Sequence, residues 1–291
     1  MTILKGFKES RMSVNGGMNI NYAIKGDGPP LLLLHGYPQT HAKWHRIAPD
    51  LAERFTVVAP DLRGYGDSDK PEGDDRHLTY SKRVMAADQV DLMRQLGFEK
   101  FQLVGHDRGA RVTHRLCRDN PDRVTRAVIM DIVPTYEVYA RMTKDIATAY
   151  FHWYFLIQPK GYPETLLGNN AEYHMEYLAK ALGGKVFSPE AYGEYLRWFK
   201  QPESIHASCE DYRAGATIDL EHDALDKGRK LNMPLLTLWG ESSLVGRAYD
   251  NLSIWRDYAE NVTGKGIPGG HFIAEESPKE TLAALLEFLQ G

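Results

Sequence analysis

A short apolar run passes directly into a glycine-flanked acidic turn, Gly105-His106-Asp107-Arg108-Gly109, and a helical pattern follows at once. The run, residues 101–104, has the length of a buried strand, and residues 108–119 have the periodicity of a helix. A strand that turns sharply into a helix, with glycines two residues to either side of the central residue, is typical of a nucleophile held in a strained turn. The turn therefore predicts a parallel α/β sheet with a reactive residue, Asp107, at its carboxyl edge.

Apolar runs and helical patterns alternate over most of the chain, which is typical of an α/β protein. Strand-like runs occupy residues 31–34, 55–60, 124–132 and 234–240, and helical patterns occupy residues 44–51, 80–96 and 278–289. From 135 to 212 the pattern is mostly helical and aromatic, without a strand-like run. We therefore expect a mostly parallel central sheet with helices on both faces, formed by residues 1–134 and 213–291, and an inserted helical cap of residues 135–212.

The composition restricts the partners and the compartment. The 291 residues are 43% hydrophobic and 25% charged, as in ordinary soluble enzymes. The formal net charge of -4 does not favour a nucleic-acid partner, and no run approaches the roughly 18 apolar residues of a membrane span. With two cysteines, Cys117 and Cys209, and no visible signal peptide, we expect a cytoplasmic protein without a disulfide framework.

An aspartate at the centre of the turn determines the chemistry. The carboxylate is ionised at neutral pH, so Asp107 needs no base to attack an sp3 carbon that carries a leaving group. The product is an ester of Asp107, which water must then hydrolyse. The following helix N-terminus favours an anion, and the backbone N–H of Arg108 can face a developing oxyanion. A second backbone donor is expected at Tyr37, in the loop His35-Gly36-Tyr37-Pro38 after a buried strand.

The expected base is His271, in the loop Gly269-Gly270-His271-Phe272 near the end of the chain. It takes the last place in the order nucleophile, acid, histidine, and it would activate the water that attacks the ester. Two acids can orient it, because Asp131 and Glu241 each follow a predicted strand. We favour Asp131, whose apolar neighbours leave an acid that needs a partner.

These segments together resemble the α/β-hydrolase fold over nearly the whole chain. They are HGYP, the run DLRGYGDSDKP at 61–71, GHDRG, Asp131 and GGHF. The aspartate nucleophile is similar to that of haloalkane dehalogenases, haloacid-acting dehalogenases and epoxide hydrolases. The run from Gly105 to Arg111 looks like the signature of haloacetate (fluoroacetate) dehalogenases, whereas the other two groups commonly carry Trp after the nucleophile. Arg108 and Arg111 can share one helical face, so we expect both to hold a substrate carboxylate.

The resemblance extends into the insertion. Residues 150–154 (YFHWY) and 209–215 (CEDYRAG) are similar to lid segments of haloacetate dehalogenases. The resemblance implies that His152, Trp153 and Tyr212 donate hydrogen bonds to the departing halide. It also implies a small haloacid as the partner, no metal or organic cofactor, and compatibility with a homodimer.

The resulting hypothesis is hydrolytic dehalogenation of short 2-haloacids, in which a haloacetate or fluoroacetate gives glycolate and halide. An epoxide hydrolase is the first alternative: it shares the aspartate nucleophile but needs two lid tyrosines, which Tyr212 and either Tyr150 or Tyr154 can supply. A hydrolase-like receptor without activity is a second alternative, disfavoured because every triad position is filled.

Overall fold

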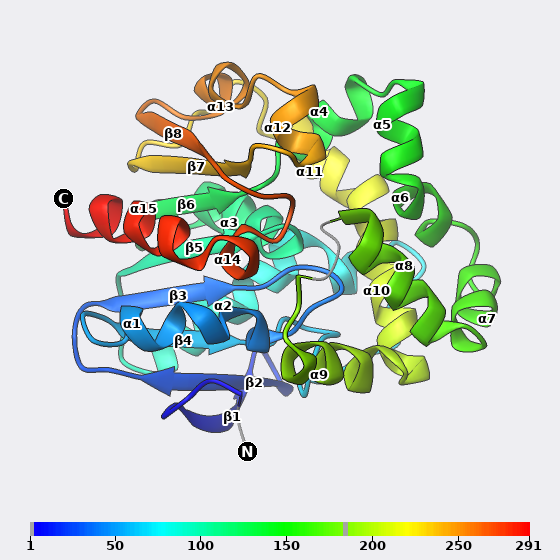
Figure 1. The fold of residues 1–291 in the computed structure, drawn as a ribbon, viewed down its shortest axis with the longest axis horizontal. Coiled ribbons are helices and arrows are strands. Elements are labelled where there is room, and N and C mark those ends of the chain that lie inside the picture. The colour runs from blue at the N-terminus through cyan, green and yellow to red at the C-terminus, as the bar shows by residue number, and fades with distance from the viewer. Residues whose placement is uncertain (1–2, 183–185) are drawn as a thin grey trace.

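The computed structural model describes residues 3–182 and 186–291, which form a layered α/β core and a helical cap (Figure 1). The strand order in the sheet is β1-β2-β4-β3-β5-β6-β7-β8, in which β1–β2 and β2–β4 are antiparallel and every other pair is parallel. The mostly parallel sheet is thus confirmed. The strands are β1 (Lys8–Val14), β2 (Met18–Lys25), β3 (Pro30–Leu34), β4 (Thr56–Pro60), β5 (Phe101–His106), β6 (Val124–Met130), β7 (Leu235–Gly240) and β8 (Val262–Ile267).

Three strands at the margins of the sheet, β1, β2 and β8, have no counterpart in the sequence prediction. In β1 and β8 exposed positions alternate with more buried ones, so polar residues and glycines interrupt any apolar run. In β2 the polar residues Asn19 and Asn21 break the run in the same way. The central parallel strands are covered on both faces, and their continuous apolar runs made them recognisable.

Helices cover both faces of the sheet, as expected, and the alternation within β3 shows why. Leu32 and Leu34 join a core cluster with α2 and α3, whereas Leu31 and Leu33 join a second cluster with the helices of the opposite face. The first face carries α2 (Lys82–Gln95), α3 (Arg108–Asp119) and α13 (Asn251–Tyr258). The second carries the 3-10 helix η1 (His41–Arg46), α1 (Ala48–Leu51), α14 (Ile273–Glu276) and α15 (Pro278–Gln290).

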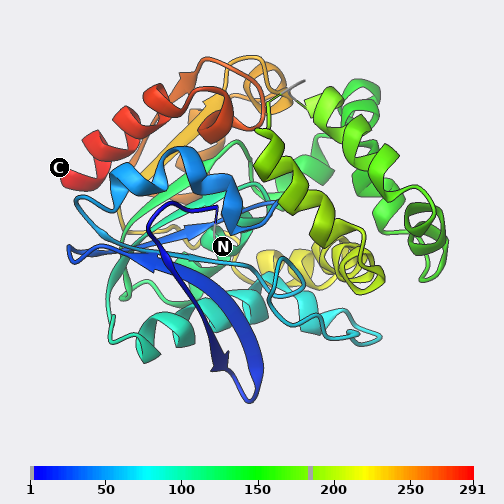
Figure 2. The same cartoon turned by 60° about the horizontal axis from the view of Figure 1, so that its bottom comes forward.

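The cap lies beyond the carboxyl ends of the parallel strands, in both views of the ribbon (Figures 1 and 2). The helix α10, which contains residue 212, continues to Ala216, and α11 follows, so the helical segment extends to Leu225. No strand occurs in its described parts, and no described helix is long and apolar enough to cross a membrane. Its helices are α4 (Thr135–Ala140), α5 (Lys144–Ala149), α6 (Phe151–Leu156), α7 (Tyr162–Gly168), α8 (Ala171–Leu182), α9 (Pro189–Phe199), α10 (Pro202–Ala216) and α11 (Ile218–Leu225).

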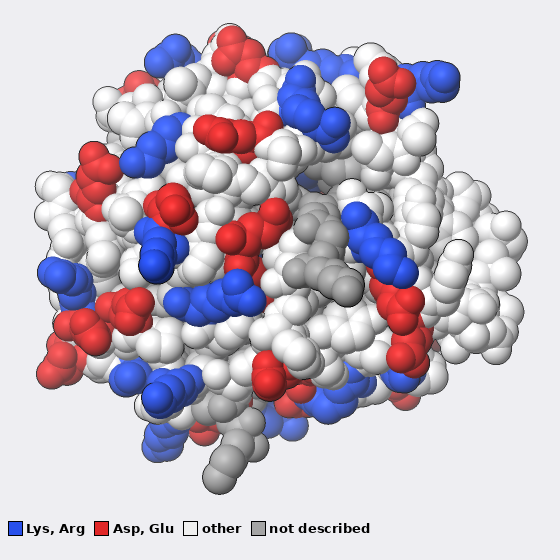
Figure 3. Space-filling view, in the orientation of Figure 1, with Lys and Arg blue, Asp and Glu red and all other residues white. Residues whose placement is uncertain are grey.

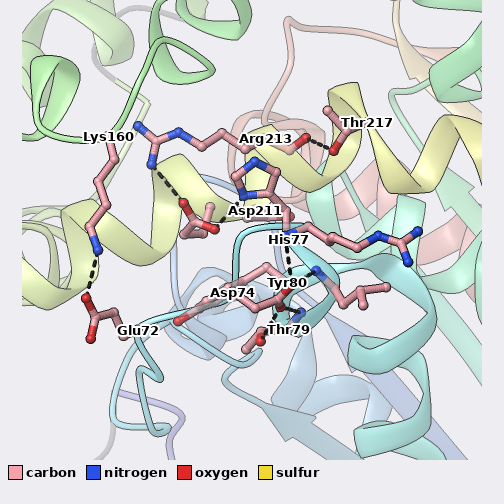
Figure 4. Close-up of polar contacts among 12 residues, drawn as sticks. Glu72, Asp74, His77, Thr79, Tyr80, Lys160, Asp211, Arg213 and Thr217 are labelled. Carbon is pink, nitrogen blue, oxygen red and sulfur yellow. Dashed lines mark hydrogen bonds and ion pairs between the residues drawn. The ribbon is translucent and has the colours of Figure 1, made fainter.

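Polar contacts fasten one side of the cap to the core loop that precedes the short 3-10 helix η2 (Leu78–Tyr80) (Figure 4). Lys160 contacts Glu72 at 2.7 Å, and His77 Nδ1 lies 2.8 Å from Glu210 Oε2. His206 Nε2 lies 2.6 Å from the carbonyl oxygen of Glu72. We call this the α10 side of the cap, because α10 carries both Glu210 and His206.

Candidate active site

Asp107 occupies a strained turn between β5 and α3, with φ of 48° and ψ of -118°. A Cβ on Gly105 would lie 2.2 Å from Thr113 Oγ1, and a Cβ on Gly109 would lie 2.2 Å from the carbonyl oxygen of His35. Neither contact is sterically allowed, so both flanking positions require glycine. A positive φ at a non-glycine residue is costly and persists only where the surroundings enforce it. The close packing around the turn therefore holds the Asp107 side chain in place above the sheet.

The two carboxylate oxygens of Asp107 have different surroundings. Oδ2 accepts a hydrogen bond from the backbone N–H of Tyr37 at 2.8 Å, and Oδ1 lies 3.9 Å from His271 Nε2. Burial raises the pKa of Asp107, but His271, Arg108 and Arg111 together hold that pKa below its ordinary value. The side chain is thus an ionised carboxylate, with one oxygen hydrogen-bonded to a backbone N–H and the other oxygen facing the histidine.

His271 is oriented by Asp131, at the carboxyl end of β6. Nδ1 of His271 lies 2.6 Å from Asp131 Oδ2, and Asp131 Oδ1 accepts hydrogen bonds from Gly240 N at 2.8 Å and Ser243 Oγ at 2.7 Å. Glu241, the other sequence candidate, is exposed, and no hydrogen bond or ion pair joins it to His271 among the described residues. Because Asp131 binds Nδ1, the Nε2 atom of His271 is left to face the nucleophile.

The pKa of His271 lies above its ordinary value, because the side chain faces two carboxylates. Burial lowers the pKa, but the hydrogen bond to Asp131 and the charges of Asp131 and Asp107 outweigh burial and raise it above its ordinary value. Removal of the charge on Asp107 would therefore bring the pKa of His271 down.

Arg108 is held by a carboxylate of the cap. Its Nε donates to Asp211 Oδ2 at 3.0 Å and its Nη2 to Asp211 Oδ1 at 2.8 Å, while both side chains are fully buried. Asp211 also accepts hydrogen bonds from Tyr65 Oη, at 2.6 Å, and from Lys82 Nζ. Only Nη1 of Arg108 lacks a partner among the described residues. The guanidinium expected to bind substrate thus has one free nitrogen, Nη1. Its orientation is fixed by Asp211, a residue that was not predicted from the sequence.

Arg111 is a buried cation that forms no ion pair with any described carboxylate. Its Nη1 donates to Val133 O at 3.1 Å and to Thr135 Oγ1 at 3.0 Å, its Nε has no partner, and no described carboxylate lies within ion-pair distance. The guanidinium lies over the ring of Trp153, 4.5 Å from its centre. Because an unpaired buried charge is unfavourable, the site is prepared for an anion.

The three aromatic residues expected to bind halide lie together. Ring centres are 5.8 Å apart for His152 and Tyr212 and 5.9 Å apart for Trp153 and Tyr212. Burial lowers the pKa of His152 to about 3, so its imidazole is neutral, and its Nδ1 has no hydrogen-bond partner in the described part of the chain. Neither the indole N–H of Trp153 nor the hydroxyl of Tyr212 makes a hydrogen bond within the described part of the chain. Three neutral groups beside the two arginines are therefore available to a small ligand.

A further set of buried polar groups, missed from the sequence, lies on the other face of the sheet, near the triad. The Nζ atom of Lys43 is buried, 4.3 Å from the centre of the Trp44 ring, and no described residue forms a hydrogen bond with it. Burial lowers the pKa of Lys43 to about 7 and raises the pKa of Glu275 to about 8. Glu275 accepts a hydrogen bond from Tyr195 Oη at 3.1 Å.

The described residues contain no group of three His, Cys, Asp or Glu arranged to hold a metal ion.

Comparison with known proteins agrees with this geometry. Residues 29–278 match the model described as the alpha/beta hydrolase fold. The chain is 44% identical to a fluoroacetate dehalogenase of Burkholderia sp, over 99% of this chain and 95% of the relative. It is 34% identical to a soluble epoxide hydrolase of Corynebacterium sp. strain C12, over 94% of each. The structure of an alpha/beta hydrolase from Nostoc sp PCC 7120 superposes with a TM-score of 0.97 at 53% identity, covering 98% of this chain and 99% of the other. The predicted resemblance is confirmed.

Proposed function

This chain belongs to the α/β-hydrolase family, and we propose that within it the protein hydrolyses the carbon–halogen bond of short 2-haloacids. The observation that carries the proposal is Arg111, a buried guanidinium near Asp107 without a protein carboxylate. A haloacid supplies the missing anion, whereas a neutral haloalkane or epoxide leaves the charge unpaired. The 44% identity to a fluoroacetate dehalogenase supports the same substrate class.

In the first step Asp107 displaces the halide. The substrate carboxylate binds to Arg111 and to the free Nη1 of Arg108, which places the α-carbon in front of Asp107 Oδ1. A new C–O bond forms as the carbon–halogen bond breaks, and the halogen leaves with the bonding electron pair. His152, Trp153 and Tyr212 donate hydrogen bonds that replace the water around the departing halide.

In the second step His271 activates water against the ester. Its Nε2 takes a proton from the water, and the hydroxide adds to the carbonyl carbon of Asp107. The oxyanion forms at Oδ2, which already accepts the Tyr37 N–H, and the Arg108 N–H is the second donor. Collapse of this intermediate breaks the bond between the Asp107 carbonyl carbon and the glycolate oxygen, and that oxygen takes the proton held by His271 Nε2. The second proton of the water is lost from the Asp107 carboxyl to solvent, which restores the carboxylate as glycolate leaves. Since the ester carries no charge, the pKa of His271 falls when its function as a base begins.

Epoxide hydrolysis is the second candidate, because two tyrosines stand beside the site. The Tyr150 ring stacks on Trp153 with centres 5.3 Å apart, and Tyr212 packs against the same indole at 5.9 Å. Tyr154 is less suited, since it is partly exposed and packs against Tyr139. The unpaired Arg111 places this function below dehalogenation.

A direct assay tests the proposal. The protein is incubated separately with fluoroacetate, chloroacetate, bromoacetate and styrene oxide, and free halide, glycolate and diol are measured. We expect equal amounts of halide and glycolate from at least one haloacetate. Diol formation without halide release would establish the epoxide hydrolase instead, and inactivity towards all three haloacetates would refute the dehalogenase.

We predict that Arg111→Leu lowers kcat/KM for chloroacetate by about 10- to 100-fold, the equivalent of one or two charge-assisted hydrogen bonds. The decrease should be much smaller for chloroacetamide, which has no charge to pair. Arg108→Leu is the matched comparison: it removes one of the two cations that pair with the buried carboxylate of Asp211 and leaves only Lys82, so it should also lower the melting temperature. An equal decrease for chloroacetate and chloroacetamide in Arg111→Leu would mean that Arg111 does not recognise the carboxylate.

A further inference from the structure

A cavity of about 180 Å³ extends from the catalytic pair to the surface between the cap and the core. His271 and Asp131 lie at its inner end, Tyr150 and Leu178 along its cap wall, and the exposed Thr148 and Arg247 at its outer end. The cap wall belongs to α5, α6 and α8, and the core wall to α12 (Leu244–Ala248) with the loop before it. In Figure 3 the surface is hollowed in the region of α12, and a basic side chain lies on the rim.

The cavity lies away from the polar contacts that fasten the cap. On the α10 side, ion pairs such as Lys160–Glu72 and His77–Glu210 tie cap and core together. Between α12 and either α5 or α8, the described residues form no hydrogen bond and no ion pair. A ligand can therefore pass between α12 and the helices α5 and α8 without breaking a hydrogen bond or an ion pair between these described elements.

The charges along the cavity favour an anion. Among the described residues that line the cavity, Asp131 is the only carboxylate, and both of its oxygens are engaged, one by His271 and the other by Ser243 and Gly240. At the outer end, Nε of Arg247 donates to the carbonyl oxygen of Ser243 at 3.2 Å. Within residues 3–182 and 186–291, its two terminal nitrogens have no hydrogen-bond partner and no carboxylate within ion-pair distance. The mouth of the cavity thus presents a free cation on a protein whose formal net charge is -4.

We propose that Arg247 is a capture residue for the anionic substrate at the mouth of this passage, and that it contributes to selection of haloacids over neutral halides. The inference rests on the proposed dehalogenation. An exposed charge at an entrance accelerates the arrival of an oppositely charged ligand and leaves the later chemical steps unchanged. We therefore expect the charge of Arg247 to raise kcat/KM without changing kcat, and we expect added salt to abolish this increase by screening the charge.

Substitution of Arg247, combined with variation of salt, tests the proposal. At an ionic strength of about 0.01 M, where the screening length is about 30 Å, Arg247→Gln should lower kcat/KM for chloroacetate by about 3- to 10-fold, and Arg247→Glu by more. In both variants kcat should stay at the wild-type value, and at about 0.5 M salt the difference should disappear. With chloroacetamide no salt-dependent difference is expected.

The control is Arg256→Gln, which removes the same charge from an exposed arginine of α13 outside the cavity lining. Thr148→Trp narrows the mouth without a change of charge, so it should lower kcat/KM for chloroacetate and chloroacetamide alike. If Arg247→Gln and Arg256→Gln show the same dependence on salt, capture by Arg247 is refuted while dehalogenation stands. If the wild-type protein releases no halide from any haloacetate, dehalogenation itself fails, and this inference fails with it.

Discussion

His271→Ala, mixed with chloroacetate, should release about one equivalent of chloride per protein and then stop, with a carboxymethyl ester left on Asp107. The displacement needs only the carboxylate of Asp107, which is ionised and in place before any base acts. Hydrolysis of the ester needs a base, and removal of a positioned general base slows such a step by about 10²- to 10⁴-fold. Stopped-time halide assays measure the burst, and mass spectrometry of the peptide that contains Asp107 identifies the ester.

Two variants make this result specific. Asp107→Asn removes the nucleophile, so neither burst nor ester should appear. Asp131→Asn keeps a hydrogen-bonding group beside His271 but removes the charge that raises the pKa of His271. Its turnover should be slow, with partial accumulation of the ester. Multiple turnovers by His271→Ala, or a burst that leaves the Asp107 peptide unmodified, would contradict the two-step mechanism.

The parts of the fold that the sequence predicted are those in which neighbours along the chain determine the structure. The central strands β3 to β7 are covered on both faces, so their residues form apolar runs that local pattern reveals. In β8, Gly264 and Gly266 lie in close contact with Thr237 and Glu241, and this requirement for space is invisible until the strands are paired. The end of the helical insertion was likewise not encoded locally, since α10 continues through residue 212 without a break.

The site divides in the same way. Glycine spacing predicted the positions of Asp107 and His271, because a tight turn and a loop tip are local structures. Arg108, in the core, and Asp211, in the cap, lie 103 positions apart in the sequence, so no local sequence pattern predicts that they pair. The apolar neighbours of Asp131 favoured it over Glu241, but its contact with His271 joins residues 140 positions apart and is visible only in the folded chain. Lys43 gave no signal either, because a lysine between apolar positions of a short helix is typical of an exposed face.

Lys43→Met should stabilise the protein at neutral pH by about 3 kcal/mol. The folded pKa of Lys43 is lowered to about 7 from an ordinary value of 10.5, and each pKa unit corresponds to about 1.4 kcal/mol. The expected gain is smaller than the full free-energy cost of this pKa shift, because the cation–π contact with the Trp44 ring stabilises the charged lysine by about 0.5–2 kcal/mol. Methionine has a similar length and shape, carries no charge and leaves no large cavity.

The pH dependence of that gain follows from the sign of the shift. Between pH 7 and 10.5 the unfolded chain binds the Lys43 proton and the folded protein does not, so wild-type stability contributed by this group rises with pH across that window. The advantage of Lys43→Met is therefore greatest at or below pH 7 and fades as the pH approaches 10.5. Urea unfolding of both proteins at pH 7 and pH 9.5 measures it.

A second buried lysine provides the control with the opposite sign. Lys82 is also buried, but its Nζ pairs with Asp211 and lies 3.4 Å from Asp219. Lys82→Met removes one partner of a buried ion pair, a change that costs up to about 3–5 kcal/mol. Arg108 continues to neutralise Asp211, so the loss should lie below that limit. If both variants destabilise the protein, the charges of Glu275, Asp107 and Asp131 stabilise the Lys43 ammonium group by more than its burial costs, and the expected gain from Lys43→Met is refuted.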